Sequence, residues 1–474
     1  MPSLVFRAGH LVRVTAAVIV TLIIAVILVA LLAVLPFSSA LIAQTVDTQA
    51  TRITFGDAVK IALQQNITLK GAENAKSLAA VAVAQQRNQF LPNLNFSTSG
   101  SDNVGQSFSQ TVGQVVNQNS TALNAGVSSN VTLFNGFQNL SLLKQARFSE
   151  SASSADLARA RQTVVFTVAS NFLSLVTLQE QLGVQQENLV AQTAQLDQIQ
   201  RMVNAGTRSI ADLYQQQAAV AQAQSALVTA RQAIELAKVD LIQTLKLDPV
   251  KTYEFTAPAI DSSAAAPRFT LDALLTSAFS DRVDLAAAQA RVDQSSEALK
   301  ASRSTRWPQI AASLAYNTAY SSLADASLSA QLNQRKGGSV GVSLSIPIFD
   351  RGTSSIASQQ AKIQLSNANL TNDLQRQTAA LDVRRAYLNY QSALEQLNAT
   401  RAQKRSSDLA LSAVQERYRV GAATLVELSL ARATQVSAAS ALVNARYTLI
   451  FQQSLMSYYT GTLDPSRVVF GTRP

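Results

Sequence analysis

The segment Ser225-Ala226-Leu227-Val228-Thr229-Ala230-Arg231 returns 215 residues later as Ser440-Ala441-Leu442-Val443-Asn444-Ala445-Arg446, with six of the seven positions identical. Other matches follow at this spacing or at one residue more. Self-similarity at a fixed spacing is typical of a duplicated structural unit. The sequence therefore predicts two copies of one unit, at 44–262 and 263–474. The further matches pair Leu133-Phe134 with Ile348-Phe349, Gly206 with Gly421, and Leu247-Asp248-Pro249 with Leu463-Asp464-Pro465.

Each predicted unit begins with a helix, expected over about 54–90 and 270–306. The helix ends before Pro92 or Pro308, because a residue that precedes proline is pushed to extended geometry. A strand, a polar loop and a second strand follow in both units. The strands are expected to cover 94–98 and 127–133 in the first unit, and 310–320 and 340–348 in the second.

The predicted strands alternate apolar with small or polar residues, more clearly in the second unit than in the first. A period of two over about ten residues is typical of a transmembrane β-strand. Four such strands cannot form an open sheet in lipid, because the N–H and C=O groups of its edges would lack hydrogen bonds. The sequence therefore predicts that the strands close by oligomerisation, and three chains would supply twelve. Aromatic residues near the strand ends suit either an interfacial girdle or a simple join between strand and helix: Phe90, Phe96, Phe134, Trp307, Tyr316, Tyr320 and Phe349.

After the second strand of each unit, apolar residues recur every seven residues. Heptad spacing predicts helices that pack side by side in a supercoil. The first unit should contain a long helix over about 140–203, a sharp turn and a returning helix, and in the second unit Lys404 is the one break in the matching long row. Each unit therefore carries a long helical hairpin, and its scarcity of large side chains suits a wall one helix deep. The rows in the first unit are Val168, Leu175, Leu182, Leu189, Leu196 and Val203, then Leu213, Val220, Leu227, Ile234 and Leu241.

The composition excludes several kinds of chemistry. Charged residues are 14% of the 474, the net charge is +10, there is no cysteine, and His10 is the only histidine. The chain therefore has no disulfide, no thiol nucleophile and no cysteine-ligated metal, and histidine-based catalysis is close to excluded. Basic residues are spread out and few aromatics accompany them, so we expect no nucleic-acid binding. We expect neither enzymatic activity nor a cofactor.

Residues 1–43 are predicted to be a signal peptide. Arg7, His10 and Arg13 precede a long apolar run, and small residues then favour cleavage after Ala40 or Ala43. The apolar run is long enough to span a bilayer, so an uncleaved anchor is the alternative. Either way, the bulk of the protein lies outside the cytoplasm.

After residue 43 the chain resembles the TolC-like outer membrane efflux protein family over essentially its whole length. The segments that carry the resemblance are the duplicated strand ends 131–136 and 346–352 and the hairpin tip 417–428. The resemblance implies a mainly α fold with membrane β-strands, in which long coiled-coil hairpins form a trimeric α-barrel across the periplasm. Four strands per chain then join a shared 12-stranded β-barrel, in the lipid of the outer membrane of a Gram-negative bacterium.

The resemblance also implies a function, that of the exit duct of a tripartite efflux or type I secretion system. Such a channel is a homotrimer and a passive conduit, and its partners are a periplasmic adaptor (membrane fusion) protein and an inner-membrane transporter that drives export. Two alternatives account for less of the sequence. A periplasmic adaptor would carry one hairpin, and a coiled-coil structural protein anchored at its N-terminus would leave the strands unexplained.

The two hairpin tips are the best-defined candidate sites. Gly206 and Gly421 fit the left-handed position that ends a helix, and 209–212 and 424–427 have the pattern of capping boxes. The resemblance implies that the tips dock adaptor hairpins, although ordinary turn residues would have the same pattern. The docking candidates are Asn204, Gly206, Thr207, Arg208, Val420, Gly421, Ala422 and Thr424.

The resemblance further implies a gate that closes the periplasmic mouth near these tips. Its candidates are Tyr418, Glu427 and Asp212, although a capping box would explain both acids without a gate. Ala423 and Leu430 stand where the family pattern leads us to expect a gating arginine and a second acidic residue. A differently built gate is therefore expected.

Overall fold

The computed structural model describes residues 51–109, 113–117, 119–256 and 269–463. The chain divides after Gln49, and the described residues all belong to the second unit of that division. The predicted signal peptide lies outside the described residues. So does the predicted boundary between the two repeats at 262/263.

The helices confirm the duplication, because each copy contains four helices of matching length. These have 11, 22, 67 and 36 residues in the first copy and the same lengths in the second. They are α2 (Phe55–Gln65), α3 (Ile67–Asn88), α4 (Gln138–Asn204) and α5 (Ile210–Leu245), then α6 (Leu271–Asp281), α7 (Val283–Ser304), α9 (Thr353–Arg419) and α10 (Leu425–Thr460).

The single first helix expected in each copy is wrong, since it breaks into α2 and α3 at Asn66 and into α6 and α7 at Arg282. Both residues adopt extended backbone angles. The Asn66 side chain accepts a hydrogen bond from the Leu69 N–H at 3.2 Å and so caps α3. Arg282 makes no such cap, and its side chain instead enters a buried polar cluster described below.

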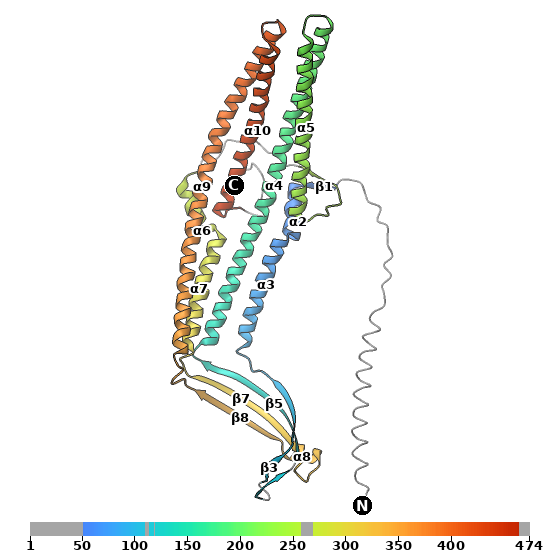
Figure 1. Ribbon diagram of the computed structural model, residues 1–474. Helices are drawn as coiled ribbons and strands as arrows, with labels where there is room; N and C mark the ends of the chain where they lie inside the picture. Colours follow the sequence, from blue (N-terminus) through green and yellow to red (C-terminus); the bar gives the residue numbers. More distant parts are fainter. Residues whose placement is uncertain (1–50, 110–112, 118, 257–268, 464–474) are drawn as a thin grey trace, which may run out of the picture. The chain divides into compact units, whose positions relative to one another are not determined.

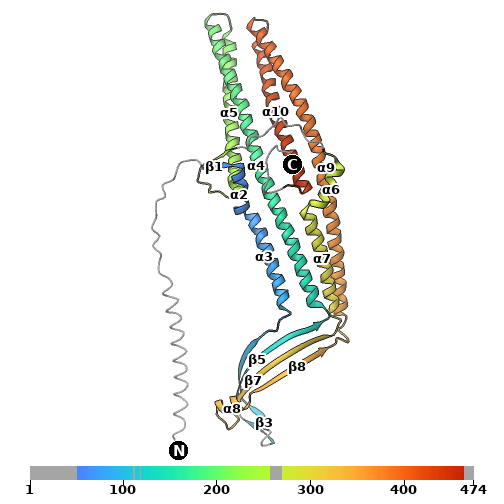
Figure 2. The same cartoon turned by 180° about the vertical axis from the view of Figure 1, so that it is seen from behind.

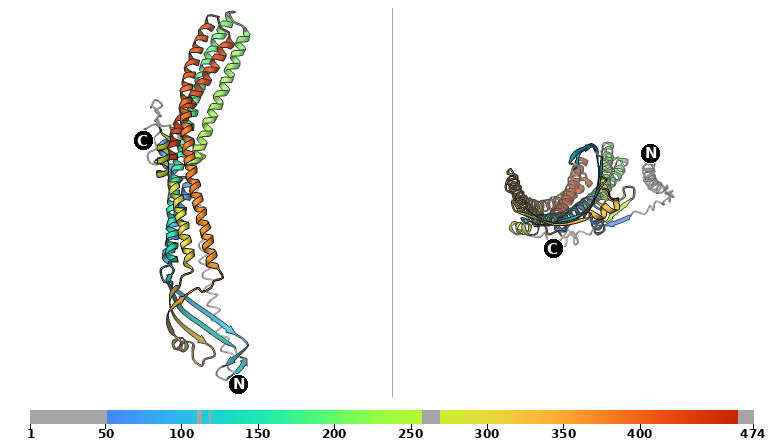
Figure 3. Two further views of the ribbon diagram at one scale, coloured as in Figure 1. Left: turned by 90° about the vertical axis from the view of Figure 1, so that its left-hand side faces the viewer. Right: turned by 90° about the horizontal axis from the view of Figure 1, so that it is seen from below.

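The helices form one layer that is four helices wide. Toward the strands, α3 packs on α4, α4 on α7 and α7 on α9, whereas toward the hairpin tips α5 packs on α4, α4 on α10 and α10 on α9. The hairpins α4–α5 and α9–α10 lie side by side in both cartoon views (Figures 1 and 2). Seen from the end, the helices follow a curve (Figure 3). None of the described helices combines the length and apolar composition needed to cross a membrane.

The buried heptad positions account for the contacts within this layer. Val168 and Leu175 of α4 are fully buried beside Leu241 of α5, in a cluster that also contains the short helix α2. Val383 and Leu397 of α9 belong to the matching cluster of the second copy. The break in the second long row, Lys404, is three-quarters buried, and its ammonium donates to Asp408 at 2.7 and 2.5 Å.

Four antiparallel strands form one sheet in the order β2-β5-β7-β8. The strand β8 ends at Ser345 instead of continuing to residue 348 as predicted, because Pro347 has no N–H to donate to a ladder. The strands are β2 (Asn95–Asn103), β5 (Ser120–Asn135), β7 (Gln309–Ser321) and β8 (Gly337–Ser345).

Three smaller features were not expected from the sequence. The polar loops contain a hairpin of β3 (Gln106–Ser109) with β4 (Gln114–Asn117), and the short helix α8 (Leu328–Gln334). A two-stranded parallel sheet joins β1 (Thr51–Thr54) to β6 (Tyr253–Thr256), about 200 residues away along the chain. Thr54 then opens α2 with a complete capping box to Asp57.

Candidate functional site

The four-stranded sheet has two chemically different faces. Its register places Phe96 of β2, Val127 of β5 and Tyr316 of β7 on the same face, because opposite residues in a ladder point to the same side. That face is largely apolar. Its polar end is the pair Asp102 and Thr121, next to the loops. The rest of the face carries Phe96, Thr98, Gly100, Leu123, Ala125, Val127, Ser129, Val131, Phe134, Ile310, Ala312, Leu314, Tyr316, Thr318, Tyr320, Gly338, Val340, Val342 and Leu344.

The opposite face consists of small and polar side chains. It carries Asn95, Ser97, Ser99, Ser101, Ala122, Asn124, Gly126, Ser128, Asn130, Thr132, Ala311, Ser313, Ala315, Asn317, Ala319, Ser339, Gly341, Ser343 and Ser345. On the apolar face, Val340 is 82% exposed and Phe96 72% exposed. A large exposed apolar face indicates an interaction with lipid or protein. A lipid-facing apolar side and a polar lumen side are what a transmembrane β-wall requires.

Both edges of the sheet are unpaired among the described residues, since β2 pairs only with β5 and β8 only with β7. An edge strand presents a row of free N–H and C=O groups, which lipid cannot satisfy. The sheet is therefore incomplete as a membrane wall within a single chain.

At the far ends of the long helices, both hairpin tips turn in the same way. Gly206 and Gly421 have φ of 71° and 80°, as predicted for left-handed helix ends. The N–H of Thr207 donates to the Met202 carbonyl and that of Ala422 to the Arg417 carbonyl. With the second bonds from the two glycines, these form a Schellman motif at each tip.

The predicted capping boxes at the start of the return helices are wrong in their reciprocal half. Ser209 accepts from the N–H of Ala211, and no bond closes from Asp212. Thr424 does accept from the Glu427 N–H at 3.2 Å, but the Glu427 carboxylate turns to Arg417 instead, with 3.4 Å between their charged atoms. The capping pattern therefore leaves both acidic side chains available for other contacts.

The first tip is attached to the second through Arg208 and Tyr418. The Arg208 guanidinium carbon lies 4.5 Å from the centre of the Tyr418 ring, and a guanidinium nitrogen donates to the Tyr418 carbonyl at 3.3 Å. Tyr418 is 2% exposed among Ile199 and Leu213 of the first hairpin. Burial raises the pKa of the Tyr418 hydroxyl, which has no hydrogen-bond partner, and the positive charge of Arg208 partly opposes the shift.

Most predicted docking residues are exposed at the tips. Within that set Val420 is 66% exposed, whereas Arg208 is half-buried against Tyr418. Of the two positions that depart from the family pattern, Ala423 is buried in the tip cluster and Leu430 is exposed. Although Ala423 replaces the expected gating arginine, Arg208 and Arg417 place positive charge at the tips. The exposed predicted docking residues are Asn204, Gly206, Thr207, Val420, Gly421, Ala422 and Thr424.

A buried polar cluster, which sequence reasoning missed, lies in the second copy where α6 meets α7, and Arg159 of the first copy lies beside it. Arg282 is 4% exposed and donates to both oxygens of Asp284 at 3.0 and 2.6 Å, and Asp382 lies 3.8 Å away. Burial alone would raise the pKa of Asp284, but the hydrogen bonds and charge of Arg282 outweigh it and lower the pKa. Nearby, the guanidinium of Arg159 in α4 lies 3.9 Å from the ring centre of Tyr458 in α10.

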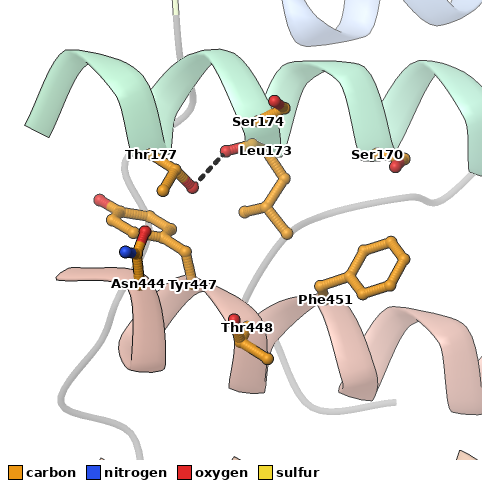
Figure 4. Close-up of a pocket in the computed structure, with 8 residues that line it drawn as sticks. All are labelled: Ser170, Leu173, Ser174, Thr177, Asn444, Tyr447, Thr448 and Phe451. Carbon is orange, nitrogen blue, oxygen red and sulfur yellow. Dashed lines mark hydrogen bonds between the residues drawn. The ribbon is translucent and has the colours of Figure 1, made fainter. Parts of the chain in front are cut away.

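A cavity of about 200 Å³ lies between α4 and α10, one helix from each copy (Figure 4). Thr177 donates to the Leu173 carbonyl at 2.7 Å on the α4 side, and the aromatic rings of Tyr447 and Phe451 come from α10. No carboxylate, ammonium, guanidinium or imidazole lines this cavity, so it offers no acid–base pair. In the described part of the chain, no cluster of three or more acidic or histidine residues could hold a metal ion.

The two-faced sheet and the paired hairpins agree with what comparisons with known proteins show. The family model for outer membrane efflux protein matches residues 58–245 and 274–458, one stretch in each copy. The chain belongs to the outer membrane efflux protein family.

Individual relatives of this efflux protein are distant in sequence. The outer membrane efflux protein BepC of Brucella suis is 23% identical over 347 residues, which cover 72% of this chain and 73% of BepC. TolC of Escherichia coli is 24% identical over 316 residues, 64% of this chain and 62% of TolC. The structure of VceC from Vibrio cholerae superimposes with a TM-score of 0.76 at 16% identity, over 86% of this chain and 96% of VceC.

The efflux protein is thus an outer-membrane exit duct of a Gram-negative bacterium. The family consists of channel proteins, and the two-faced sheet and long hairpins of this chain suit a channel wall. This fold has two hairpins and two strand pairs, whereas an adaptor was expected to have one hairpin. A channel wall also accounts for the four strands, which the alternative of a coiled-coil structural protein leaves unexplained.

Proposed function

We propose that three copies of the efflux protein close into one duct, through which an inner-membrane transporter drives substrates by way of a periplasmic adaptor. The observation that carries the proposal is the sheet, apolar on one face, polar on the other and unpaired at both edges. Four strands per chain give twelve in a trimer, enough for a closed barrel in lipid. The apolar face then contacts the outer-membrane lipid and the polar face lines the lumen.

The long helix α9 supports closure by further copies, because it is an outer helix of the layer and carries an exposed apolar row. In water such a row would be covered by a partner helix. The helices at the opposite edge, α3 and α5, supply exposed apolar residues that include Leu78 (72%) and Val228 (63%). The row on α9 contains Ile356 (56%), Ile363 (56%), Leu370 (64%), Leu374 (62%), Leu381 (44%) and Leu388 (55%).

Cysteine cross-linking tests the trimer without background from native thiols, because the chain contains no cysteine. We expect Ser97→Cys on β2 combined with Ser343→Cys on β8 to give covalent dimers and trimers with a bifunctional maleimide, since these residues lie on opposite edges of the same polar face. Each single variant should give at most a dimer. Outer-membrane fractions should contain a heat-modifiable trimer, and recovery of monomer from the soluble periplasm would contradict the proposal.

We propose that the exposed tip residues dock the adaptor. The substitution Gly421→Trp adds bulk where the structure has open space, although the left-handed backbone there disfavours any side chain. Gly421→Asn is the matched control, because asparagine tolerates this conformation with little bulk. Export should be lost in Gly421→Trp and kept in Gly421→Asn, with trimers intact in both. Normal export by the tryptophan variant would refute docking at this tip.

We propose that the same tips close the periplasmic mouth. Arg208 on Tyr418 holds one hairpin to the other, and Arg417 with Glu427 holds α9 to α10 within the second hairpin. Burial raises the pKa of the Tyr418 hydroxyl, and the negative charge of Asp212 adds to that rise. Release of these contacts would let the hairpins separate and widen the mouth.

A further inference from the structure

The chain passes between the layer of long helices and the four-stranded sheet four times, and each crossing carries a basic residue and an exposed aromatic residue in the same order from helix to strand. Where α3 leads into β2, Arg87 comes before Phe90, and where α7 leads into β7, Arg306 comes before Trp307. Where β5 leads into α4, Phe137 comes before Lys144. Where β8 leads toward α9, Phe349 comes before Arg351. In all four, the cation is on the helix side and the aromatic on the strand side.

The cations at these crossings are exposed and have no acidic partner among the described residues. We call them the junction cations, and they are Arg87, Lys144, Arg147, Arg303, Arg306 and Arg351. Glu150, three residues from Arg147, forms no ion pair with it, and two other acids close to these cations along the chain are engaged elsewhere. Glu297 is buried and pairs with Lys300 at 2.6 Å, and Asp350 accepts from the N–H groups of Gly352 and Ser354 at 3.0 and 2.9 Å.

Basic residues at the hairpin tips behave differently. There Arg417 pairs with Glu427, Arg419 with Glu416 at 2.8 Å, and Arg201 with Asp197 at 2.8 Å. The chain therefore pairs these three tip arginines with acids, and Arg208 lies on Tyr418, whereas the cations at the crossings have no acidic partner in the described part of the chain. Unpaired positive charge gathered on one level of a protein attracts an anionic partner.

The exposed aromatic residues indicate where that partner lies. Trp307 is 58% exposed, Phe137 63% and Phe349 84%. Aromatic side chains collect at the boundary between hydrocarbon and water, and Lys and Arg side chains just outside it extend toward the lipid phosphates. An aromatic level followed by a cationic level, repeated at every crossing, matches the sequence of layers in a bilayer surface.

We propose that the junction cations bind the phosphate groups of anionic glycerophospholipids in the membrane leaflet nearest the helices. This inference rests on the proposed function, which places the apolar face of the sheet in lipid. Four of the six cations lie on α3, α4 and α7, Arg306 lies between α7 and β7, and Arg351 lies just before α9, so in a trimer they form a continuous belt around the duct. Lys144 and Arg147 are six and nine residues inside α4, or about 9 and 14 Å from its first residue at 1.5 Å per residue. Side chains of a helix tilt toward its N-terminus, so these two long side chains extend back toward the membrane surface.

The test measures the thermal unfolding temperature of the purified full-length trimer in detergent, with added phosphatidylglycerol or phosphatidylcholine. We expect phosphatidylglycerol to raise the unfolding temperature and phosphatidylcholine to raise it much less. The difference between the two lipids should shrink as the salt concentration increases. In the variant Arg87→Gln/Arg303→Gln/Arg306→Gln the difference should fall by more than half. The conservative variant with lysine at these three positions should keep it, because lysine also binds phosphate.

A matched control removes three other exposed arginines without ion pairs, as Arg384→Gln/Arg401→Gln/Arg405→Gln, and should keep the full difference. Equal stabilisation by the two lipids overturns the inference, as does an equal rise with inorganic phosphate, which would indicate a site for soluble anions. Conductance of the same preparation distinguishes a failure of this inference from a failure of the proposed function. Conducting trimers without a lipid preference overturn this inference alone, whereas failure to form trimers overturns the proposed function and the inference with it.

Discussion

The guanidinium carbon of Arg208 lies 4.5 Å from the ring centre of Tyr418, so the tip of the first hairpin rests on a buried residue of the second. A half-buried cation–π contact of this kind contributes about 1 kcal/mol. Arg208→Ala should therefore loosen the contact between the tips. We expect a lower unfolding temperature and a higher single-channel conductance in a planar bilayer, and an unchanged conductance would contradict a role for Arg208 in closure.

Tyr418→Phe is the matched control for Arg208→Ala. The Tyr418 hydroxyl is buried without a hydrogen-bond partner, so its removal should leave stability within about 0.5 kcal/mol or raise it slightly. The ring that Arg208 contacts is kept. Tyr418→Ala should cost about 3 kcal/mol, because it leaves a cavity among Ile199, Leu213 and Leu428.

Glu427 is expected to help close the mouth through its ion pair with Arg417. The pair is exposed, so its loss should change stability by less than about 1 kcal/mol. Glu427→Ala should nevertheless raise conductance in a planar bilayer, and an unchanged closed state would refute the gate. Glu416→Ala is the control, because it removes an exposed ion pair with Arg419 near the same tip.

The two faces of the sheet should respond in opposite ways to a charge. Leu314 is 54% exposed on the apolar face, and its neighbour Ser313 points to the polar face. Leu314→Lys should cost about 2–4 kcal/mol if it faces lipid and should prevent assembly of the heat-modifiable trimer. Ser313→Lys should assemble normally. The reverse result would mean that the polar face contacts lipid and the apolar face lines the lumen.

Asp284 should make the protein less stable in acid. Its pKa lies below the ordinary value of about 3.9, so its contribution is complete above that pH and is lost as the pH falls through the lowered pKa. Asp284→Asn should cost about 2–3 kcal/mol at neutral pH, because Arg282 would keep only Asp382 nearby. In thermal unfolding measurements at a series of pH values, the stability of this variant should fall less below pH 4 than that of the unchanged protein. The double variant Arg282→Met/Asp284→Leu should recover part of the loss.

Periodicity predicted most of the fold. A period of seven marked α4 and α9, because one stripe of each helix packs against its neighbours. A period of two marked β5, β7 and β8, because side chains alternate between the apolar and the polar face of the sheet. The break at Asn66 had a signal, since asparagine is a good helix cap. The break at Arg282 had none, because it is stabilised by Asp284 and Asp382, the latter 100 residues further along the chain. The pairing of β1 with β6 joins segments about 200 residues apart and is equally invisible to local patterns.

The candidate site was predicted in part. The left-handed glycines followed from the turn that a Schellman motif requires, and both were confirmed. The contacts of Tyr418 and Glu427 depend on how the two hairpins pack on each other, which no spacing within one hairpin determines. Arg208 was predicted as a docking residue because the resemblance implies docking at the hairpin tips, and the structure adds its contact with Tyr418 of the second hairpin.

The matching lengths of α4 and α9, 67 residues each, limit how this protein can change. Each residue adds about 1.5 Å to a helix, so an insertion in one hairpin alone would set its tip above the other. A shift of one residue would also rotate the apolar stripe by about 100° and uncover it. Only whole heptads, inserted at equivalent places in both copies and in both arms of each hairpin, would lengthen the duct and keep its rim level.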